Sequence, residues 1–250
     1  MPGSETSADL AWAPTLRRSV GLFSDFLVEQ SDPARFYTAL ARDSVALVAQ
    51  HTDLDGATML DVGGGPGHFH AAFAAAGASY FCLDIDREEL VAGSVPARRA
   101  VVGDGGRLPF ADDSVDLCFS SNVLEHVRDP WRMADEMLRV TRPGGLVFLG
   151  YTAWWGPWGG HETSPWHFLG GRRARRRYRR KHGQEPKNRY GETLFGVTVA
   201  GGLRWARTQQ LADVVVAIPR YHPRAAHWVV RVPVLREVVT WNLALVLRKR

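Results

Sequence analysis

The chain has little cysteine and no long apolar segment. Cys82 and Cys118 are the only cysteines among 250 residues, and each lies in a short apolar run. Two such thiols cannot form a disulfide framework, so we expect them to be buried and reduced, as in a cytoplasmic protein. No apolar run approaches about 18 residues, which argues against a membrane-spanning helix. Residues 1–10 are small and acidic rather than basic and then apolar, so no signal peptide is expected.

The positive charge of the chain is concentrated in one segment. There are 31 Lys and Arg residues against 26 Asp and Glu, which gives a net charge of +5. Eight basic residues form what we call the arginine run: Arg172, Arg173, Arg175, Arg176, Arg177, Arg179, Arg180 and Lys181. These eight charges exceed the net charge, so the rest of the chain is net negative. The run can be a solvated helix face, but eight uncompensated charges repel one another and favour an anionic partner, such as an anionic membrane surface.

A glycine-rich stretch at residues 59–68 contains the clearest signal for ligand binding. An apolar run ends at Asp61, four of the next six residues are glycine, and an alanine-rich segment follows, which predicts a strand, a tight turn and a helix. Glycines permit a positive φ and a close approach of a ligand to the backbone. A dinucleotide fingerprint would need a third glycine where His68 stands. A glycine-rich turn without a ligand remains the alternative.

Two further aspartates follow the ends of predicted strands. Asp84 lies near the end of the apolar run at residues 80–85, where a carboxylate can accept the hydroxyls of a ribose. Asp86 and Glu89 form a helix-start signal, which explains Asp86 without a ligand. Asp104 follows a short predicted strand at residues 100–102, within a Gly-Asp-Gly turn that is a weak signal alone. Asp61, Asp84 and Asp104 in series predict one binding edge.

The glycine stretch, Asp61-x-Gly63-x-Gly65-x-Gly67, resembles the first motif of class I S-adenosylmethionine-dependent methyltransferases. Leu-Pro-Phe at 108–110, Leu-Glu-His-Val at 124–127 and Arg-Pro-Gly-Gly at 142–145 are similar to the ubiquinone-biosynthesis, type 11 branch. The resemblance covers roughly residues 55–152. It implies an α/β fold: a Rossmann-like, doubly wound, seven-stranded sheet, mostly parallel with an antiparallel last strand, with N-terminal helices and an insertion after the fifth strand.

The resemblance also implies a cofactor site for S-adenosyl-L-methionine. Asp61 and the glycine loop would hold the methionine part, Asp84 the ribose and Asp104 the adenine. The full set of expected cofactor-binding residues is Asp61, Gly63, Gly65, Gly67, Asp84, Asp104, Gly105 and Asn122.

His126 is the first candidate for a catalytic base, because it follows the fourth predicted strand and imidazole titrates near neutral pH. The alternative is a helix-start histidine that orients the loop or touches the cofactor. His161, Glu162 and His167 are rival bases. They do not form a zinc-protease motif, because H-E-x-x-H is incomplete and Pro165 would break the required helix, and no metal-binding set is predicted.

The remainder of the chain divides into segments with different expected roles. Residues 1–50 should form a tail up to about Arg17 and then cap helices, with a break or a first turn at Pro33. Residues 51–152 should form the cofactor-binding core, whose fifth strand is expected over 146–149, and residues 153–197 an insertion. Residues 198–250 should close the same domain with a helix over 198–209, a strand over 213–219, a helix near 225–239 and a strand over 242–247. Tyr37 is expected in the core or in a lid over the cofactor.

Four tryptophans crowd the start of the insertion, at positions 154, 155, 158 and 166. They can line a pocket for an apolar, aromatic or sugar-containing acceptor, or pack beneath the insertion. We therefore expect a cytoplasmic methyltransferase for a small-molecule or lipid-linked acceptor, favoured at oxygen, with peripheral membrane contact through the arginine run. An RNA methyltransferase is less favoured, because no Asn/Asp-Pro-Pro-Tyr-like motif follows the fourth strand. A non-catalytic protein that binds anionic surfaces is the third hypothesis.

Overall fold

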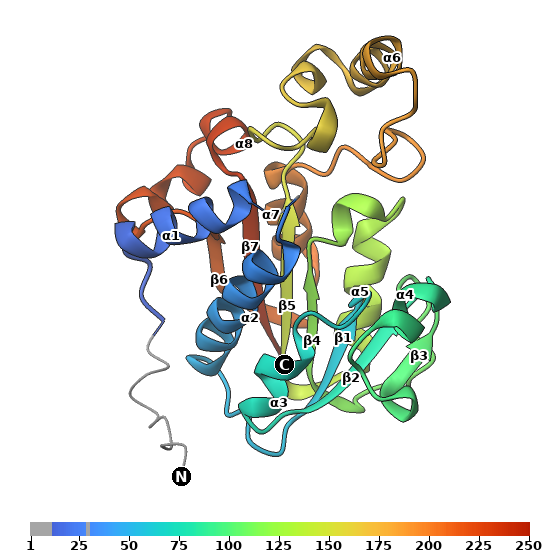
Figure 1. The fold of residues 1–250 in the computed structure, drawn as a ribbon. Coiled ribbons are helices and arrows are strands. Elements are labelled where there is room, and N and C mark those ends of the chain that lie inside the picture. Colours follow the sequence, from blue (N-terminus) through green and yellow to red (C-terminus); the bar gives the residue numbers. More distant parts are fainter. Residues whose placement is uncertain (1–11, 29–30) are drawn as a thin grey trace.

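A computed structural model describes residues 12–28 and 31–250, which form a seven-stranded sheet flanked by helices (Figure 1). The sheet order is β3-β2-β1-β4-β5-β7-β6. Its strands are β1 (Thr58–Val62), β2 (Ser79–Asp84), β3 (Ala100–Val102), β4 (Val115–Ser121), β5 (Thr141–Thr152), β6 (Ala212–Pro219) and β7 (Asn242–Lys249).

The pairing of the strands confirms the predicted fold class. Strands β1 to β5 are parallel to one another, whereas β7 is antiparallel to both β5 and β6. The strand order reverses between β1 and β4, which is the point where open α/β sheets bind ligands at their carboxyl edge.

The sheet is buried on both faces because its strands alternate between two cores. Leu60 and Val62 belong to the core shared with α5 and α7, whereas Met59 belongs to the core shared with α1, α2 and α3. The helices are α1 (Leu16–Leu27), α2 (Pro33–Ala49), α3 (His70–Ala75), α4 (Arg87–Ala92), α5 (Pro130–Val140), α6 (Gly171–His182), α7 (Val199–Thr208) and α8 (Leu235–Val239).

Polar caps fix where the helices begin. Asp32 and Asp129 cap α2 and α5, each followed by a proline at the first helical position. Asp86 caps α4 and Thr198 caps α7 by accepting backbone N–H groups. These starts confirm the predicted break at Pro33 and the helix-start role of Asp86.

Three predicted boundaries are wrong. The helix expected near residues 225–239 is a 3-10 segment, Arg224–Arg231, followed by the short α8, because Pro233 lacks an N–H and Val234 has φ +67°. Strand β5 begins at Thr141 rather than 146. The tail expected up to Arg17 already contains the start of α1 at Leu16, and its residues 1–11 lie outside the described part.

Both cysteines are free and buried, as expected. Within the described ranges, no helix has the length and apolar character that would be needed to cross a membrane.

A fully buried arginine joins the carboxyl end of β4 to its neighbours. Arg220, directly after β6, donates from Nη1 to Ser121 Oγ at 2.8 Å and from Nη2 to Ser44 Oγ at 2.6 Å. Its guanidinium lies 5.1 Å from the ring centroid of Phe148 in β5. Burial lowers the pKa of Arg220. The two hydroxyls on β4 and α2 therefore hold this side chain in a fixed position.

Gly150 in β5 leaves the space that Arg220 occupies, which gives a stability prediction. A Cβ at Gly150 would lie 2.8 Å from Arg220 Nη1 and 3.1 Å from the Phe148 ring. Because Arg220 is fixed by its hydroxyl partners, Gly150→Ala should lower the free energy of unfolding by about 1–3 kcal/mol, measured by urea denaturation.

Gly21→Ala in the interior of α1 is the control, since nothing lies within 4 Å of its added Cβ. It should raise the free energy of unfolding by about 0.5–1 kcal/mol. Unchanged stability of Gly150→Ala would contradict the proposed fixed position of Arg220.

Candidate active site

The turn after β1 contains three glycines in a backbone conformation that other residues rarely adopt. Gly63, Gly65 and Gly67 have φ values of +77°, +51° and +77°, which side chains rarely permit. A Cβ at Gly65 would also lie 2.8 Å from Glu89 Oε2, and one at Gly67 would lie 2.3 Å from the Val95 side chain. Glycine is therefore required at these positions both by the backbone conformation and by the side chains packed against this glycine turn at the carboxyl edge of the sheet.

Asp61 lies beneath the glycine turn and is only 1% exposed. A Cβ at Gly64 would lie 2.9 Å from its carboxyl group, and the hydroxyl of Tyr80 donates to Asp61 Oδ2. Burial raises the pKa of Asp61 to about 7, and the neighbouring charge of Asp84 adds to this shift, while the Tyr80 hydrogen bond opposes it. A ligand ammonium reaching this carboxylate must approach through the turn, so its contact with Asp61 stays a prediction.

Asp84 at the end of β2 holds the turn in place. Its Oδ2 accepts from Gly65 N at 2.8 Å, and its Oδ1 accepts from Asp86 N at 2.9 Å. Its own carbonyl accepts from Gly103 N at 2.9 Å, which brings the loop after β3 alongside. Asp104 in that loop is exposed and accepts from Gly106 N. The three predicted aspartates thus follow adjacent parallel strands at one edge.

Gly105 and Asn122 complete the predicted cofactor set. Gly105 packs against the side chains of Val62 and Met133, so the loop after β3 lies over the end of β1. Asn122 follows β4 with φ +59°, and its Oδ1 accepts from Asn242 Nδ2 at 2.8 Å. The next residue, Val123, fills the space beside Gly63. Both predicted residues therefore border the glycine turn or the strand ends next to it.

Tyr37 connects α2 to the glycine turn. Its ring stacks on His68 with centroids 4.2 Å apart and an interplanar angle of 6°. Burial lowers the pKa of His68, which favours the neutral imidazole. Tyr37 also contacts Phe36 of the core. It therefore lies between the core and the glycine turn, where the prediction placed it either in the core or in a lid over the cofactor.

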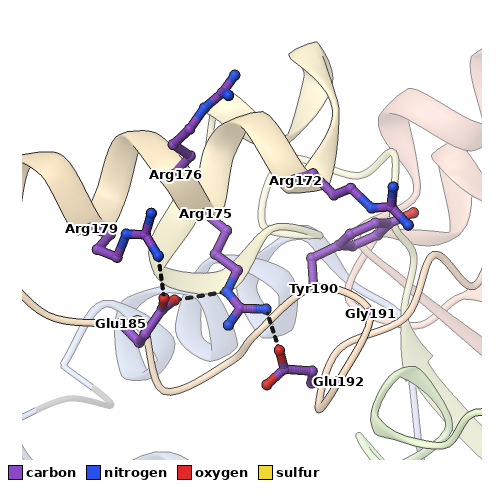
Figure 2. Close-up of a pocket in the computed structure, with 8 residues that line it drawn as sticks. All are labelled: Arg172, Arg175, Arg176, Arg179, Glu185, Tyr190, Gly191 and Glu192. Atoms are coloured by element: carbon purple, nitrogen blue, oxygen red, sulfur yellow. Dashed lines mark hydrogen bonds and ion pairs between the residues drawn. The ribbon is translucent and has the colours of Figure 1, made fainter.

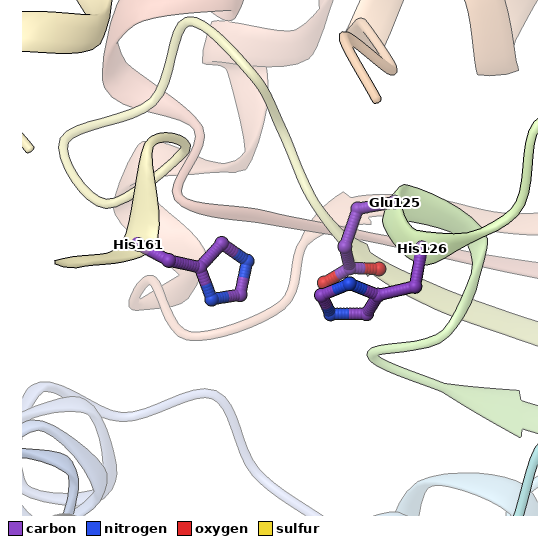
Figure 3. A group of neighbouring side chains, drawn as sticks. All are labelled: Glu125, His126 and His161. Carbon is purple, nitrogen blue, oxygen red and sulfur yellow. The ribbon is translucent and has the colours of Figure 1, made fainter. Parts of the chain in front are cut away.

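Two of the four candidate bases lie together with a buried glutamate. Glu125, His126 and His161 each offer one N or O atom, and these atoms lie within 4.8 Å of one another (Figure 3). Glu125 and His126 come from the turn after β4, whereas His161 reaches them from the insertion after β5. We call these three residues the Glu–His–His cluster. The sequence did not mark Glu125, because a glutamate next to a histidine has no distinctive spacing.

Hydrogen bonds orient two members of the cluster. His126 Nδ1 lies 2.7 Å from the carbonyl oxygen of Thr193, so Nδ1 donates and Nε2 keeps a free lone pair. Glu125 Oε1 accepts from Thr152 N at 3.0 Å at the end of β5. Burial, together with the neighbouring His126, lowers the pKa of His161 to about 4, so this imidazole is neutral at pH 7. The cluster can accept protons or donate lone pairs.

His167 and Glu162 lie outside the cluster. His167 is fully buried, with Nε2 3.1 Å from the Gly156 carbonyl oxygen and its ring against Trp154. Glu162 accepts from Asn188 Nδ2 at 3.1 Å. These contacts are structural ones within the insertion, and neither side chain is placed beside His126.

The four tryptophans of the insertion divide into two pairs. Trp154 is buried against Tyr190, and Trp158 packs with Trp241 and with Phe26 of α1. Trp155 and Trp166 are exposed. Packing therefore explains one pair, and the other pair is available to a partner.

The fold and the glycine turn define an α/β protein that binds a nucleoside-containing cofactor at its strand ends, and comparison with known proteins identifies the class. The methyltransferase-domain profile matches residues 60–149. An uncharacterized methyltransferase of Mycobacterium sp. strain KMS is 55% identical over 242 residues, covering 94% of this chain and 95% of the relative. One from Mycobacterium tuberculosis strain H37Ra is 54% identical over 243 residues, covering 93% and 95%.

Solved structures show the same fold. An S-adenosylmethionine-dependent methyltransferase from Mesorhizobium loti superposes with a TM-score of 0.57 at 21% identity, covering 84% of this chain and 98% of the other. One from Aquifex aeolicus gives a TM-score of 0.54 at 12% identity, covering 93% and 98%. The chain belongs to the class I S-adenosylmethionine-dependent methyltransferase family.

The residues present fit this cofactor. S-adenosylmethionine carries a positive charge and a ribose, and supplies an electrophilic methyl group when bound. The glycine turn lies at the carboxyl edge of the sheet, and the carboxyl groups of Asp61 and Asp84 lie beneath and beside it. The assignment of each residue to one part of the cofactor stays a prediction.

The position of Asp84 gives a binding prediction. Asp84→Asn removes a negative charge and weakens acceptance from Gly65 N–H, so it should lower the affinity for S-adenosylmethionine at least tenfold in calorimetry. Asp86→Asn is the matched control, because asparagine caps a helix as well as aspartate, and its affinity should stay within about twofold. Equal affinities of the two variants would refute the role assigned to Asp84.

The buried state of Asp61 gives a pH prediction. Its folded pKa lies above the unfolded value, so its favourable contribution is fully present below about pH 4 and is lost as the pH rises through about 7. The side chain of the Asp61→Asn variant cannot ionise, so the variant should be more stable than the wild type at high pH. The difference in unfolding free energy between variant and wild type should be up to about 3 kcal/mol larger at pH 8 than at pH 5.

Urea denaturation of the cofactor-free protein at the two pH values measures this difference. Tyr80→Phe removes the hydrogen bond that favours the carboxylate, so it should enlarge the loss of stability between pH 5 and pH 8. A gain for Asp61→Asn that is the same at both pH values would show that Asp61 is ionised throughout.

Proposed function

We propose that this methyltransferase acts on a hydroxyl oxygen of a lipid-linked acceptor at an anionic membrane surface. The observation that supports this proposal is one face of the insertion, close in sequence to His161, on which basic and aromatic side chains are exposed together. Short apolar turns and a basic helix are adjacent there, and this combination suits the interface of an anionic bilayer.

The aromatic part of this face precedes α6. Trp166 is 44% exposed, Leu169 is 61% exposed, and Phe168 is also exposed. Phe168 stacks on the exposed Trp155 with ring centroids 6.4 Å apart. Large apolar side chains are costly to leave in water when they gather in one place, and such groups mark interaction sites.

The basic part is α6, and the expectation that all eight of its charges are uncompensated is wrong. Arg175 pairs with Glu185 and Glu192, and Arg179 pairs with Glu185 (Figure 2). Arg177 lies 3.9 Å from the ring centroid of Trp166.

Besides Arg177, five basic residues of α6 are exposed with no carboxylate within ion-pair distance among the residues described: Arg172, Arg173, Arg176, Arg180 and Lys181. Figure 2 shows Arg176 directed away from the acidic pair that lines a hollow of about 380 Å³. At about 1 kcal/mol per charge near an anionic surface, five charges are enough for reversible attachment.

A hydroxyl acceptor is supported by the Glu–His–His cluster. A hydroxyl must lose its proton as it is methylated, and an imidazole beside the Glu125 carboxyl group can take up that proton directly or through a bound group. The two imidazoles are thus proposed to handle the proton of the acceptor.

The acceptor class can be tested with methyl-labelled S-adenosylmethionine. The protein is incubated with a mycobacterial extract separated into lipid, RNA, protein and small-molecule fractions. We expect label in the lipid fraction, because the basic and aromatic face should present lipid-linked hydroxyls to the cluster. Label in RNA alone would replace this proposal with the RNA methyltransferase hypothesis.

Charge variants separate the surface from the active site. Arg172→Gln, Arg173→Gln and Arg176→Gln together should reduce flotation with phosphatidylglycerol vesicles at least tenfold and leave cofactor affinity unchanged. The matched control replaces Arg204, Arg207 and Arg231, which are exposed outside the insertion, by glutamine. Equal losses in both triple variants would show a general charge effect and contradict a specific docking face.

A further inference from the structure

We infer that Glu125, His126 and His161 form a binding site for one divalent transition-metal ion. Two imidazoles and one carboxylate are a donor set that such ions use in proteins, with the remaining coordination positions left open. The chemical purpose suggested below rests on the proposed hydroxyl acceptor, but metal binding itself does not.

The first argument is the orientation of His126. Its Nδ1–H is directed to the Thr193 carbonyl oxygen at 2.7 Å, which fixes the tautomer and leaves Nε2 as a lone-pair donor. Metal-binding histidines almost always donate their other N–H to a backbone carbonyl, a carboxylate or water. His126 therefore already has the outer contact of a metal ligand.

The second argument is that two buried polar atoms of the cluster lack partners. Glu125 is 1% exposed, and while Oε1 accepts from Thr152 N, Oε2 has no hydrogen-bond partner. His161 Nε2 is also buried without one. Within the described part of the chain, no lysine or arginine lies within ion-pair distance of Glu125. A cation between these atoms would satisfy a buried carboxylate that is costly to leave unpaired.

The third argument is the distance between the donor atoms. One atom from each residue lies within 4.8 Å of the other two. Metal–ligand bonds of about 2.0–2.2 Å place ligands on one ion roughly 3 to 4.4 Å apart, so a small side-chain rotation closes the set. The rings of His126 and His161 come from separate segments, with centroids 5.2 Å apart and an interplanar angle of 60° (Figure 3).

The two histidines of the cluster are more exposed than its glutamate. His126 and His161 are only partly buried, in contrast to Glu125. An acceptor hydroxyl that coordinated the ion at an open position would lose its proton to water more readily. This links the cluster to the proposed function without requiring either imidazole to act as a free base.

Metal binding is measured on the full-length protein without cofactor or acceptor. After removal of metals by chelation, titration with ZnCl2 and with MnCl2 in a calorimeter should show saturable binding of about one ion per chain for at least one of them. MgCl2 should bind much more weakly, because Mg²⁺ prefers oxygen ligands. His161→Ala and Glu125→Gln should each lower the affinity at least tenfold.

His182→Ala, on the exposed end of α6, is the control and should bind like the wild type. Circular dichroism shows whether each variant is folded, and Glu125→Gln keeps an oxygen that can accept from Thr152 N–H. Absence of saturable Zn²⁺ and Mn²⁺ binding, or equal affinity in His161→Ala and the wild type, would overturn the site. Neither result depends on which extract fraction takes up methyl label.

Discussion

The hydrogen bond from Gly65 N–H to the Asp84 carboxylate is the contact on which the cofactor edge depends. It ties the turn after β1 to the end of β2, and the carbonyl of Asp84 in turn accepts from the loop after β3. Three segments that are separate in sequence are thereby held at one edge. Because Asp61 is buried under the same turn, one carboxyl group lies beneath the turn and another, that of Asp84, lies beside it.

The insertion after β5 supplies what the shared methyltransferase core does not. It brings His161 to the turn after β4 and presents an aromatic and basic face around α6. Trp154 packs against Tyr190, and Trp158 packs against Trp241. These contacts hold in place the segment that carries the exposed Trp155 and Trp166. The methyltransferase-domain match covers residues 60–149, so the insertion lies outside it.

The contact pattern also explains where reasoning from local patterns failed. The helix expected near residues 225–239 has a helical apolar pattern, but Pro233 removes a backbone donor and Val234 adopts a positive φ. In the sequence the arginine run has no acidic neighbours, because its partners Glu185 and Glu192 come after the helix. The segment that contains them folds back so that both pair with Arg175. In both cases residues outside the repeating pattern decide the structure or the charge balance, and the pattern itself does not indicate them.

The sequence alone determined the fold class, the order of most elements and the cofactor, because glycine turns, helix caps and alternating strands are local properties that neighbouring residues dictate. It marked Asp61, Asp84, His126 and His161 as candidates. Only the tertiary structure decided that Asp61 is buried beneath the turn, that His161 and Glu125 lie beside His126, and that His167 does not. Such groupings depend on how distant segments pack, since burial and orphaned hydrogen-bonding atoms arise only when those segments exclude water together.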